Sequence, residues 1–409
     1  MTLPTAALTK SRLVPMRPRD PNEPGRTASS LELFFDLVFV VAVSIAAAEL
    51  HHAFTEAHIV DGLIAYSVVF FAIWWAWMNF TWFATSFATD DWLYRVLSIV
   101  QMGGVLVLAA GIDPVFADDD YTVLVLSYAV MRVAMVAQWL RASRSAGQHR
   151  RATQIYAGGI ATVQALWLLQ LLLTGPVSSV ALLVLIAAEI AIPMIAERQG
   201  ATPWHPHHIT ERYGLFTLIL LGESLLASAN AIIEALHDDQ ALGSLISIAV
   251  LTLLVTAALW WMYFWPPHHR AISAFGSSLR YGYVHYFVFA AAGALSAGIE
   301  VEIGVLTHHS KLGEVAASFT VAVPIAIFVL GIWWIALRGA ADRVVNAVIP
   351  LAVVLILLDP ILPIPFALTA VVMTLVVAVL VLHPPVPEHA GPANTMPSAA
   401  EPNTNLRER

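Results

Sequence analysis

Five ionisable residues lie inside long apolar stretches of the sequence: Glu32, Asp36, Arg132, Glu189 and Glu223. Glu223, Glu189 and Arg132 each fall near the middle of their stretch. Glu32 and Asp36 stand near the start of another and are four positions apart, so they share one face of a helix. Ionisable groups in membrane-spanning segments are costly and usually mark a pathway or a paired contact. These five residues are therefore the first candidates for chemistry or ion movement.

The charges near the middle of the stretches leave two interpretations open. Arg132 can pair with Glu189 or with Glu223, and such a pair would lock helices together without indicating any activity. One pair leaves one carboxylate unmatched, and an unmatched acid indicates a site for a substrate, an ion or a proton. We take Glu223 as the first candidate, because Gly222 allows close backbone approach and Ser224 supplies a hydroxyl group.

Histidine supplies one further candidate. His285 lies just inside another apolar stretch and suits a proton-linked role. The other histidines group in short clusters between the apolar stretches, with no HExxH spacing, and the chain has no cysteine. The sequence also lacks a phosphate-binding loop and a nucleophile elbow. We therefore predict no metal centre, no cofactor and no set of catalytic residues.

Three neighbouring tryptophans, Trp74, Trp75 and Trp77, also suggest two roles. The first is an aromatic belt at the membrane interface. The alternative is a cation–π surface that binds an organic cation.

The elements that must position these residues are helices. The chain is 59% hydrophobic and 12% charged with mean hydropathy +0.75, whereas about a quarter of the residues of a soluble domain are charged. Apolar stretches of roughly 17–25 residues recur, each long enough to cross a bilayer as a helix. The sequence predicts an all-α polytopic membrane protein with about 12 spans: 31–49, 61–84, 94–112, 121–140, 155–174, 179–197, 211–234, 243–265, 281–301, 314–337, 343–359 and 364–382.

The distribution of positive charge predicts the orientation. Apart from Arg132 and Lys311, the 20 Lys and Arg residues fall in the two tails and in alternate connections, Arg212 among them. By the positive-inside rule both termini are cytoplasmic. The opposite side carries acidic residues, including Glu300 and Glu302, so the net charge of −8 gives no reason to expect nucleic acid as a partner. The expected partners are the lipid bilayer and a small solute or ion, and a homo-oligomer is left open.

The two halves of the chain contain similar landmarks in the same order. Trp74–Trp77 corresponds to Trp260–Tyr263, and Ala109–Asp113 corresponds to Ser296–Glu300. An even number of helices per half would relate the halves as parallel repeats. The predicted divisions are a basic cytoplasmic tail (1–29), two six-helix membrane repeats (30–200 and 201–383) and a disordered cytoplasmic tail (384–409).

Several of these segments resemble a known family. Leu31–Val40, His208–Phe216, Leu221–Ser224 and the stretch from Tyr286 to Glu300 are similar to signatures of the bacterial low-temperature-requirement A (LtrA) family. The resemblance implies a multi-pass protein of the bacterial inner (plasma) membrane. The family is named for growth in the cold and implies no activity. Phe34–Asp36 is also similar to the Phe-Ser-Asp signature of potassium channels built from six-helix repeats, with Phe35 in place of serine.

The leading hypothesis is a secondary transporter or an ion-conducting protein in which two six-helix halves frame a pathway. Glu223, Asp36 and Arg132 would lie near that pathway, and protonation of a carboxylate would couple conformational change to the proton gradient. A non-transporting structural or sensory membrane protein is one alternative. An intramembrane enzyme that uses Asp36 and Glu223 as an acid–base pair is another.

Overall fold

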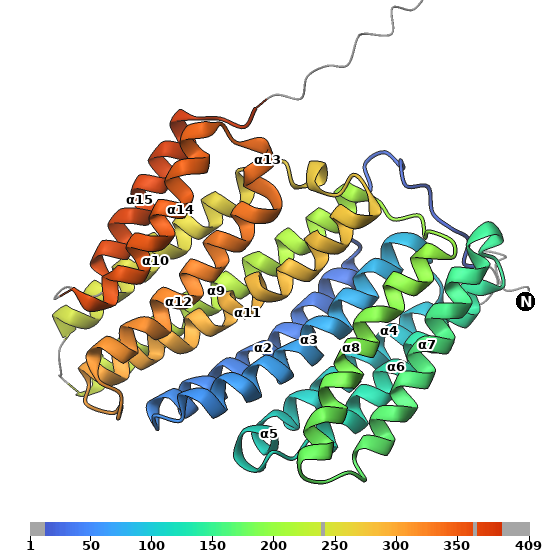
Figure 1. Cartoon of the computed structure of the whole chain (residues 1–409), viewed down its shortest axis with the longest axis horizontal. Helices are drawn as coiled ribbons and strands as arrows, with labels where there is room; N and C mark the ends of the chain where they lie inside the picture. The colour runs from blue at the N-terminus through green and yellow to red at the C-terminus, as the bar shows by residue number, and fades with distance from the viewer. Residues whose placement is uncertain (1–12, 239–241, 363–365, 387–409) are drawn as a thin grey trace, which may run out of the picture.

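The computed structural model describes residues 13–238, 242–362 and 366–386, and these ranges contain helices and connections but no strand. Twelve long helices in the described ranges run side by side along a common direction (Figure 1). Their bounds are α2 Ser30–Thr55, α3 Ile59–Phe87, α4 Trp92–Ala110, α6 Thr122–Ser143, α7 Arg150–Gln170, α8 Pro176–Arg198, α9 Pro206–Asp238, α10 Leu242–Phe264, α11 Phe275–Leu306, α12 Glu314–Ile332, α14 Arg343–Leu358 and α15 Ala367–Leu382.

Short elements connect or extend these helices. They are α5 Ile112–Asp118, η1 Gly147–His149, η2 His268–Ala271, the π-helical segment η3 Trp333–Leu337, α13 Arg338–Ala340 and η4 Asp359–Ile361. The all-α prediction is confirmed, and each predicted span corresponds to one long helix. Residues 1–12 and 387–409, which belong to the predicted tails, lie outside the described residues.

Length and hydropathy support a multi-pass membrane protein. Ten helices of the described chain are long and apolar enough to cross a bilayer, and α15 is a shorter apolar helix. The helix α7 is not among these, because its sequence includes two arginines and several glutamines. It nevertheless packs along both α6 and α8 within the bundle. Apolar side chains such as Leu172, Val133 and Leu183 are exposed on the outer surface, as expected for contact with lipid.

The N-terminal and C-terminal halves of the bundle lie beside one another. Figure 1 shows α2 and α3 next to α9 and α11, with the remaining helices of each half farther out. Contacts across the boundary join α2 to both α9 and α11, and α3 to the same two helices. This boundary contains the candidate residues on α2 and α9. The internal repeat itself stays a prediction.

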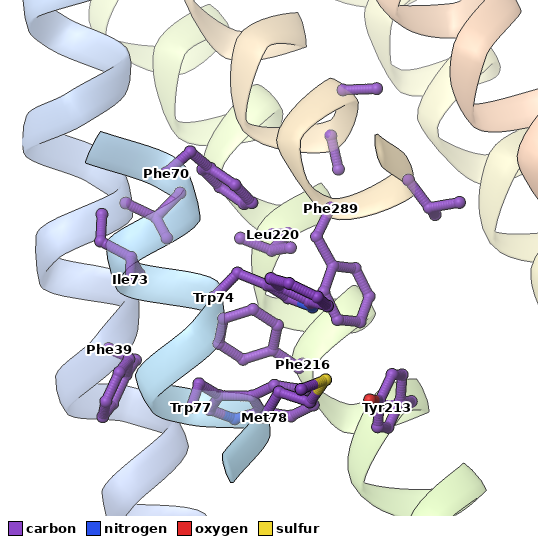
Figure 2. Packing of buried hydrophobic residues seen from close by; sticks show 14 of the residues in the cluster. Phe39, Phe70, Ile73, Trp74, Trp77, Met78, Tyr213, Phe216, Leu220 and Phe289 are labelled. Carbon is purple, nitrogen blue, oxygen red and sulfur yellow. The ribbon is translucent and has the colours of Figure 1, made fainter. Parts of the chain in front are cut away.

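Aromatic side chains fill the boundary. Trp77 on α3 stacks on Phe216 of α9 with 4.5 Å between ring centroids and meets Phe289 of α11 edge-on at 5.7 Å (Figure 2). Phe35 of α2 stacks on Phe80 of α3 at 3.8 Å. Such contacts add about 0.5–1.5 kcal/mol per pair to the burial of the rings themselves. The aromatic core therefore holds α2, α3, α9 and α11 in a fixed register.

The aromatic-belt interpretation is wrong for Trp74, Trp75 and Trp77. These side chains are 2%, 1% and 0% exposed, so they reach neither the lipid interface nor an open cation-binding surface. The physical reason lies in the indole N–H groups of Trp75 and Trp77, which donate hydrogen bonds to the buried acids Glu189 and Asp36. Tryptophan here combines a large apolar ring with the donor that an intramembrane carboxylate needs.

Polar side chains define several helix starts. Ser29 and Glu32 form a capping box at the start of α2, and Asp91 caps α4 by accepting a hydrogen bond from Tyr94 N. Asp91 also accepts from the backbone N–H of Val14 at 2.9 Å and pairs with Arg141 of α6. One carboxylate thereby fixes the segment before α2 and the ends of α4 and α6.

Two helices approach closely because one carries glycine. A Cβ atom built on Gly298 of α11 would overlap the backbone carbonyl of Thr320 on α12. Backbone cannot swing aside as a side chain can, so the α11–α12 packing requires glycine at this position. Gly103 on α4 differs, since nothing lies within 4 Å of its built Cβ.

We predict that Gly298→Ala lowers stability by about 1–3 kcal/mol, the usual cost of overpacking a close contact. The matched change Gly103→Ala should leave stability unchanged or slightly raised, because alanine favours helix and meets open space. Thermal unfolding of the purified proteins in detergent, followed by size-exclusion chromatography, measures both. Equal melting temperatures for Gly298→Ala and wild type would contradict the predicted contact.

Asp91 should make stability fall in acid. Burial alone would raise the pKa of Asp91, but hydrogen bonds from Arg141 and from the N–H groups of Tyr94 and Val14 outweigh it and hold the pKa below its usual value. The ionised form therefore stabilises the fold at neutral pH, and that contribution is lost as the pH falls through the lowered pKa. At pH 7 the melting temperature of Asp91→Asn should be lower than that of wild type. As the pH is lowered from 7 to 3, the melting temperature of Asp91→Asn should fall less steeply than that of wild type. Parallel curves for the two proteins would contradict this role.

Candidate functional site

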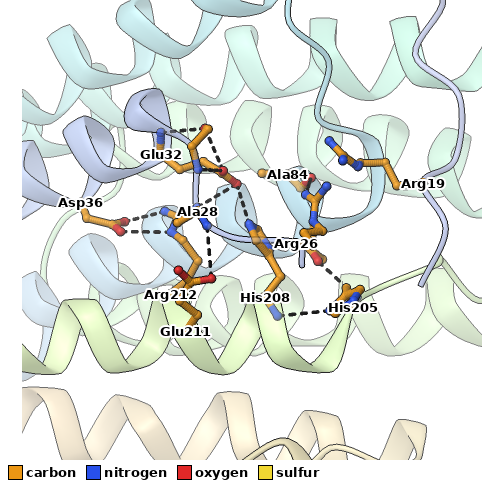
Figure 3. Close-up of polar contacts among 12 residues, drawn as sticks. Arg19, Arg26, Ala28, Glu32, Asp36, Ala84, His205, His208, Glu211 and Arg212 are labelled. Atoms are coloured by element: carbon orange, nitrogen blue, oxygen red, sulfur yellow. Dashed lines mark hydrogen bonds and ion pairs between the residues drawn. The ribbon is translucent and has the colours of Figure 1, made fainter. Parts of the chain in front are cut away.

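The acids of α2 meet basic residues of α9 with the same spacing. Glu32 and Asp36 are four positions apart on one face of α2, and His208 and Arg212 are four positions apart on one face of α9. Figure 3 shows the four side chains pointing toward one another between the two helices. We call Glu32, Asp36, His208 and Arg212, with Trp77, the Arg212 cluster.

Arg212 is bonded to both acids of the cluster. Its Nε lies 3.0 Å from Asp36 Oδ2 and its Nη2 lies 2.5 Å from Asp36 Oδ1, which is a two-point contact, while Nη1 lies 3.3 Å from Glu32 Oε1. Trp77 Nε1 donates a 2.7 Å hydrogen bond to Asp36 Oδ1. The side chain of Arg212 is 0% exposed. Both carboxylates therefore have a permanent cationic partner in the protein interior.

The capping residue and a histidine complete the environment of Glu32. Its Oε2 accepts hydrogen bonds of 2.8 Å from both the backbone N–H and the hydroxyl of Ser29. His208 Nε2 lies 3.2 Å from Glu32 Oε1. The same acid thus closes the capping box of α2 and binds α9.

The placement of Arg212 corrects the sequence interpretation. The sequence interpretation counts it among the basic residues that flank a cytoplasmic connection, whereas the structure places it inside α9, which begins at Pro206, and fully buried. The available signal was the spacing: the pair His208/Arg212 matches the pair Glu32/Asp36, and charged residues at matching intervals on two helices favour a contact. Glu302 is corrected in the same way, since it lies within α11 rather than in an external connection and is buried, and Glu300, at the end of the predicted span 281–301, lies within the same helix.

A second buried ion pair joins α6 to α8. Arg132 Nη2 lies 3.1 Å from Glu189 Oε2, and these side chains are 3% and 1% exposed. The same Glu189 oxygen accepts a 2.8 Å hydrogen bond from Trp75 Nε1. Arg132 also donates to the Tyr128 hydroxyl at 2.8 Å, and its guanidinium lies 4.7 Å from the centroid of that ring. Of the two partners that the sequence left open for Arg132, the structure selects Glu189.

Glu223 is the acid that remains. It lies on α9 and is half-buried, and its Oε2 accepts a 2.6 Å hydrogen bond from Ser44 Oγ of α2. Within the described ranges, no Arg, Lys or His forms an ion pair with it. Ser224, predicted to supply the hydroxyl group, is buried with its Oγ bonded to nothing described, so the hydroxyl comes from Ser44 instead.

A second acid lies near Glu223. Glu300 on α11 interacts electrostatically with Glu223, and its Oε2 lies 3.2 Å from His51 Nδ1 of α2. The sequence offers no signal that links Ser44 or His51 to Glu223. A serine or histidine inside an apolar helix has many structural uses, so only the packing of α2 against α9 and α11 connects them to Glu223.

His285 belongs to a separate network. Its Nε2 lies 3.1 Å from the hydroxyl of Tyr263, and its Nδ1 lies 2.7 Å from the carbonyl of Tyr281. The Tyr281 hydroxyl lies 3.1 Å from His268 Nδ1, and burial lowers the pKa of His268 to about 4. His285 is 0% exposed and does not contact Glu223 or Asp36 in the described structure. The structure therefore does not bring this predicted residue together with the carboxylates.

The arrangement separates the proposed acid–base pair of the enzyme hypothesis. Asp36 is bonded to Arg212 and Glu223 to Ser44, and Arg212 and Glu223 are about 16 Å apart along α9 at 1.5 Å per residue. A single small substrate cannot contact both carboxylates at that distance. The residues that the structure describes also include no group of three or more His, Asp or Glu side chains placed to hold a metal ion.

Two comparisons with known proteins bear on this chain. A family model described as "Bacterial low temperature requirement A protein (LtrA)" matches residues 27–382. The chain is also similar to an uncharacterized protein of Rhizobium meliloti (strain 1021), with 27% identity over 277 residues that cover 62% of this chain and 62% of that protein. The matched family region contains the Arg212 cluster, the Arg132–Glu189 pair and Glu223.

The Arg212 cluster should be essential to the fold. Arg212→Gln leaves Glu32 and Asp36 buried without a cation, which costs about 3–5 kcal/mol for a broken buried pair. We expect a large loss of folded protein in detergent, measured by fluorescence-detected size exclusion. Combining Arg212→Gln with Asp36→Asn and Glu32→Gln should restore part of it, since no unpaired charge remains.

Arg95 provides a matched control, because it pairs with Asp90 in an exposed position. Arg95→Gln should change little, as is usual for surface pairs. If Arg212→Gln folds as well as Arg95→Gln, the cluster does not stabilise the bundle.

Proposed function

Because the chain belongs to the bacterial low temperature requirement A (LtrA) family and has many helices suited to span a membrane, we propose that it is a secondary transporter or ion-conducting protein. The site of action is Glu223, whose charge is neutralised in turn by a proton or a cation and then released. The proposed location is the bacterial inner membrane with both termini in the cytoplasm, which the positive-inside rule supports.

The observation that carries the proposal is the unequal pairing of the four candidate acids. Glu32, Asp36 and Glu189 each contact an arginine, whereas in the described ranges Glu223 has no basic partner and accepts a hydrogen bond from the neutral hydroxyl of Ser44. An ionised carboxylate within a bilayer is costly without a positive partner. A proton or a metal cation is the partner that a transport cycle would supply, and its arrival and departure can favour different conformations.

The position of Glu223 adds support. Ser44, Glu223 and Glu300 come from α2, α9 and α11, which meet where the two halves of the bundle contact each other. Transporters with repeated architecture commonly bind substrate at the repeat interface near the bilayer midplane. We include the internal repeat in this proposal: α2 and α9 would be its equivalent first helices.

The direction of α2 and α9 agrees with that repeat. Asp36 contacts Arg212, and farther along both helices Ser44 contacts Glu223. Contacts that advance together along two helices mean that the helices run in the same direction. Parallel repeats related by an axis along the membrane normal require this of equivalent helices.

A second candidate is a non-transporting structural or sensory membrane protein. The Arg212 cluster and the Arg132–Glu189 pair favour it, because both are buried and fixed by several hydrogen bonds. In this case Glu223 would have no working cycle, and neutralising it would not alter any flux. The two candidates therefore differ in a measurable property of one residue.

We predict that Glu223→Gln abolishes ion movement. The purified protein, reconstituted into liposomes with a pH-sensitive dye inside, should carry H⁺ down an imposed gradient or exchange it for Na⁺ or K⁺. Glutamine keeps the size and the acceptor for Ser44 but cannot gain or lose a proton, so flux should fall at least tenfold. Ser44→Ala should have a smaller effect, because the carboxylate survives.

Glu56→Gln is the matched control, since Glu56 pairs with Lys311 on the exposed end of the bundle. It should retain wild-type flux. Two results would contradict the proposed pathway and favour the structural or sensory candidate. One is that the reconstituted wild-type protein shows no flux of H⁺, Na⁺ or K⁺, and the other is that Glu223→Gln leaves the flux unchanged.

A further inference from the structure

A separate pocket lies away from Glu223, near the connection between α8 and α9. Side chains from α3, α6, α7, α8 and α11 line it, together with residues of that connection. The cavity volume is about 50 Å³, and the surrounding space, open mouth included, is about 570 Å³. The pocket therefore suits a small molecule rather than a large one.

Aromatic rings form much of the wall. The rings are Trp82, Trp139, Tyr156, Trp204 and Tyr283. Trp139 and Tyr156 stack with 4.2 Å between centroids and 4° between planes, and Trp82 meets Trp204 edge-on at 5.8 Å. These contacts hold the rings in fixed orientations before any ligand enters.

The polar atoms of several rings are already occupied. Trp82 Nε1 donates to the Tyr213 hydroxyl at 3.1 Å, and the Tyr283 hydroxyl donates to the Ile190 carbonyl at 3.1 Å. The Tyr156 hydroxyl donates to Glu197 Oε1 at 2.9 Å. These groups therefore offer a ligand few free polar atoms, and a cation that meets a ring face meets the negative end of the aromatic quadrupole.

Glu197 is the acid in this wall. It lies near the C-terminal end of α8, and its carboxylate accepts three hydrogen bonds, from the Tyr156 hydroxyl and from the N–H and hydroxyl groups of Thr202. All three donors are neutral. No arginine or lysine in the described parts of the chain forms an ion pair with Glu197. His149 is the basic side chain that interacts electrostatically with Glu197. The carboxyl group is thus held in place by neutral donors, without an arginine or lysine ion pair in the described structure.

We propose that this pocket binds a small organic cation, an alkylammonium or quaternary ammonium group, with Glu197 as its counter-ion and the aromatic rings around it. Cation–π contacts contribute most when the cation is desolvated, as it would be inside a bundle. An anionic ligand is disfavoured by the carboxylate and the ring faces. The site lies on different residues from those of the proposed ion pathway, so it stands whether or not the protein transports ions.

Tryptophans other than Trp74, Trp75 and Trp77 are therefore the better candidates for a cation–π site. The second-span tryptophans are buried and donate to acids or contact other rings. Trp82 from the same helix, and Trp139 and Trp204 from elsewhere in the chain, line the pocket that contains Glu197. Sequence proximity did not reveal this set.

Equilibrium binding to the full-length protein in detergent tests the site. The probes are choline and its neutral isostere 3,3-dimethylbutan-1-ol, and the readout is quenching of tryptophan fluorescence, checked by calorimetry. We expect choline to bind saturably and at least tenfold more tightly than the neutral alcohol. Glu197→Gln, which keeps acceptors for Tyr156 and Thr202, should weaken choline at least tenfold and leave the alcohol unchanged.

Two further variants keep the test decisive. Trp204→Leu removes one ring without touching the hydrogen bonds of Glu197 and should also weaken choline, so it serves if Glu197→Gln does not fold. Trp260→Leu changes a tryptophan on the exposed face of α10 and should bind as wild type does. Equal binding of choline and the alcohol, no binding of choline to wild type, or unchanged choline binding after a folded Glu197→Gln or Trp204→Leu change would overturn the proposal.

Discussion

The pairing of Arg212 with Glu32 and Asp36 is the interaction on which the rest of the structure depends. Three ionisable side chains are buried here, and each is tolerable because the others and their hydrogen-bond donors are adjacent. The pairing requires α2 to lie directly against α9. It thereby fixes the contact between the two halves of the bundle, since α2 belongs to the first half and α9 to the second.

That contact helps to determine which of the four candidate acids has no arginine partner in the described structure. With Asp36 bonded to Arg212, the same two helices bring Ser44 to Glu223 farther along their length. Arg132, the arginine near the middle of a predicted span, is bonded to Glu189 on α8. The proposed working residue is thus distinguished from the other three candidate acids by partners that packing decides. The same packing of helices thus accounts for the Arg212 cluster, for the Arg132–Glu189 pair and for the lack of an arginine at Glu223 in the described structure.

Aromatic residues connect these ionic contacts to the apolar core. The indole groups of Trp75 and Trp77 each place a ring among hydrophobic neighbours and an N–H on a buried carboxylate. In the pocket beside α8, other aromatic rings lie around Glu197, whose carboxylate forms no ion pair with an arginine in the described structure. Aromatic walls are therefore common to the acids paired with arginine and to the acid of the proposed cation pocket, and the guanidinium contact is what distinguishes them.

The sequence by itself determined the helical class, the approximate bounds of each long helix, the family and the cost of an acid at positions 32, 36, 189 and 223. It could do so because bilayer thickness sets helix length and hydropathy records it residue by residue. Only the tertiary structure decided that Arg212 lies in the interior, that Arg132 takes Glu189 rather than Glu223, and that Trp82, Trp139 and Trp204 share a pocket with Glu197. The physical reason is that a charge on one helix constrains its own depth in the membrane but not its rotation or its neighbour. Partners are chosen when helices far apart in the sequence pack, and that choice depends on the shapes of all the side chains between them.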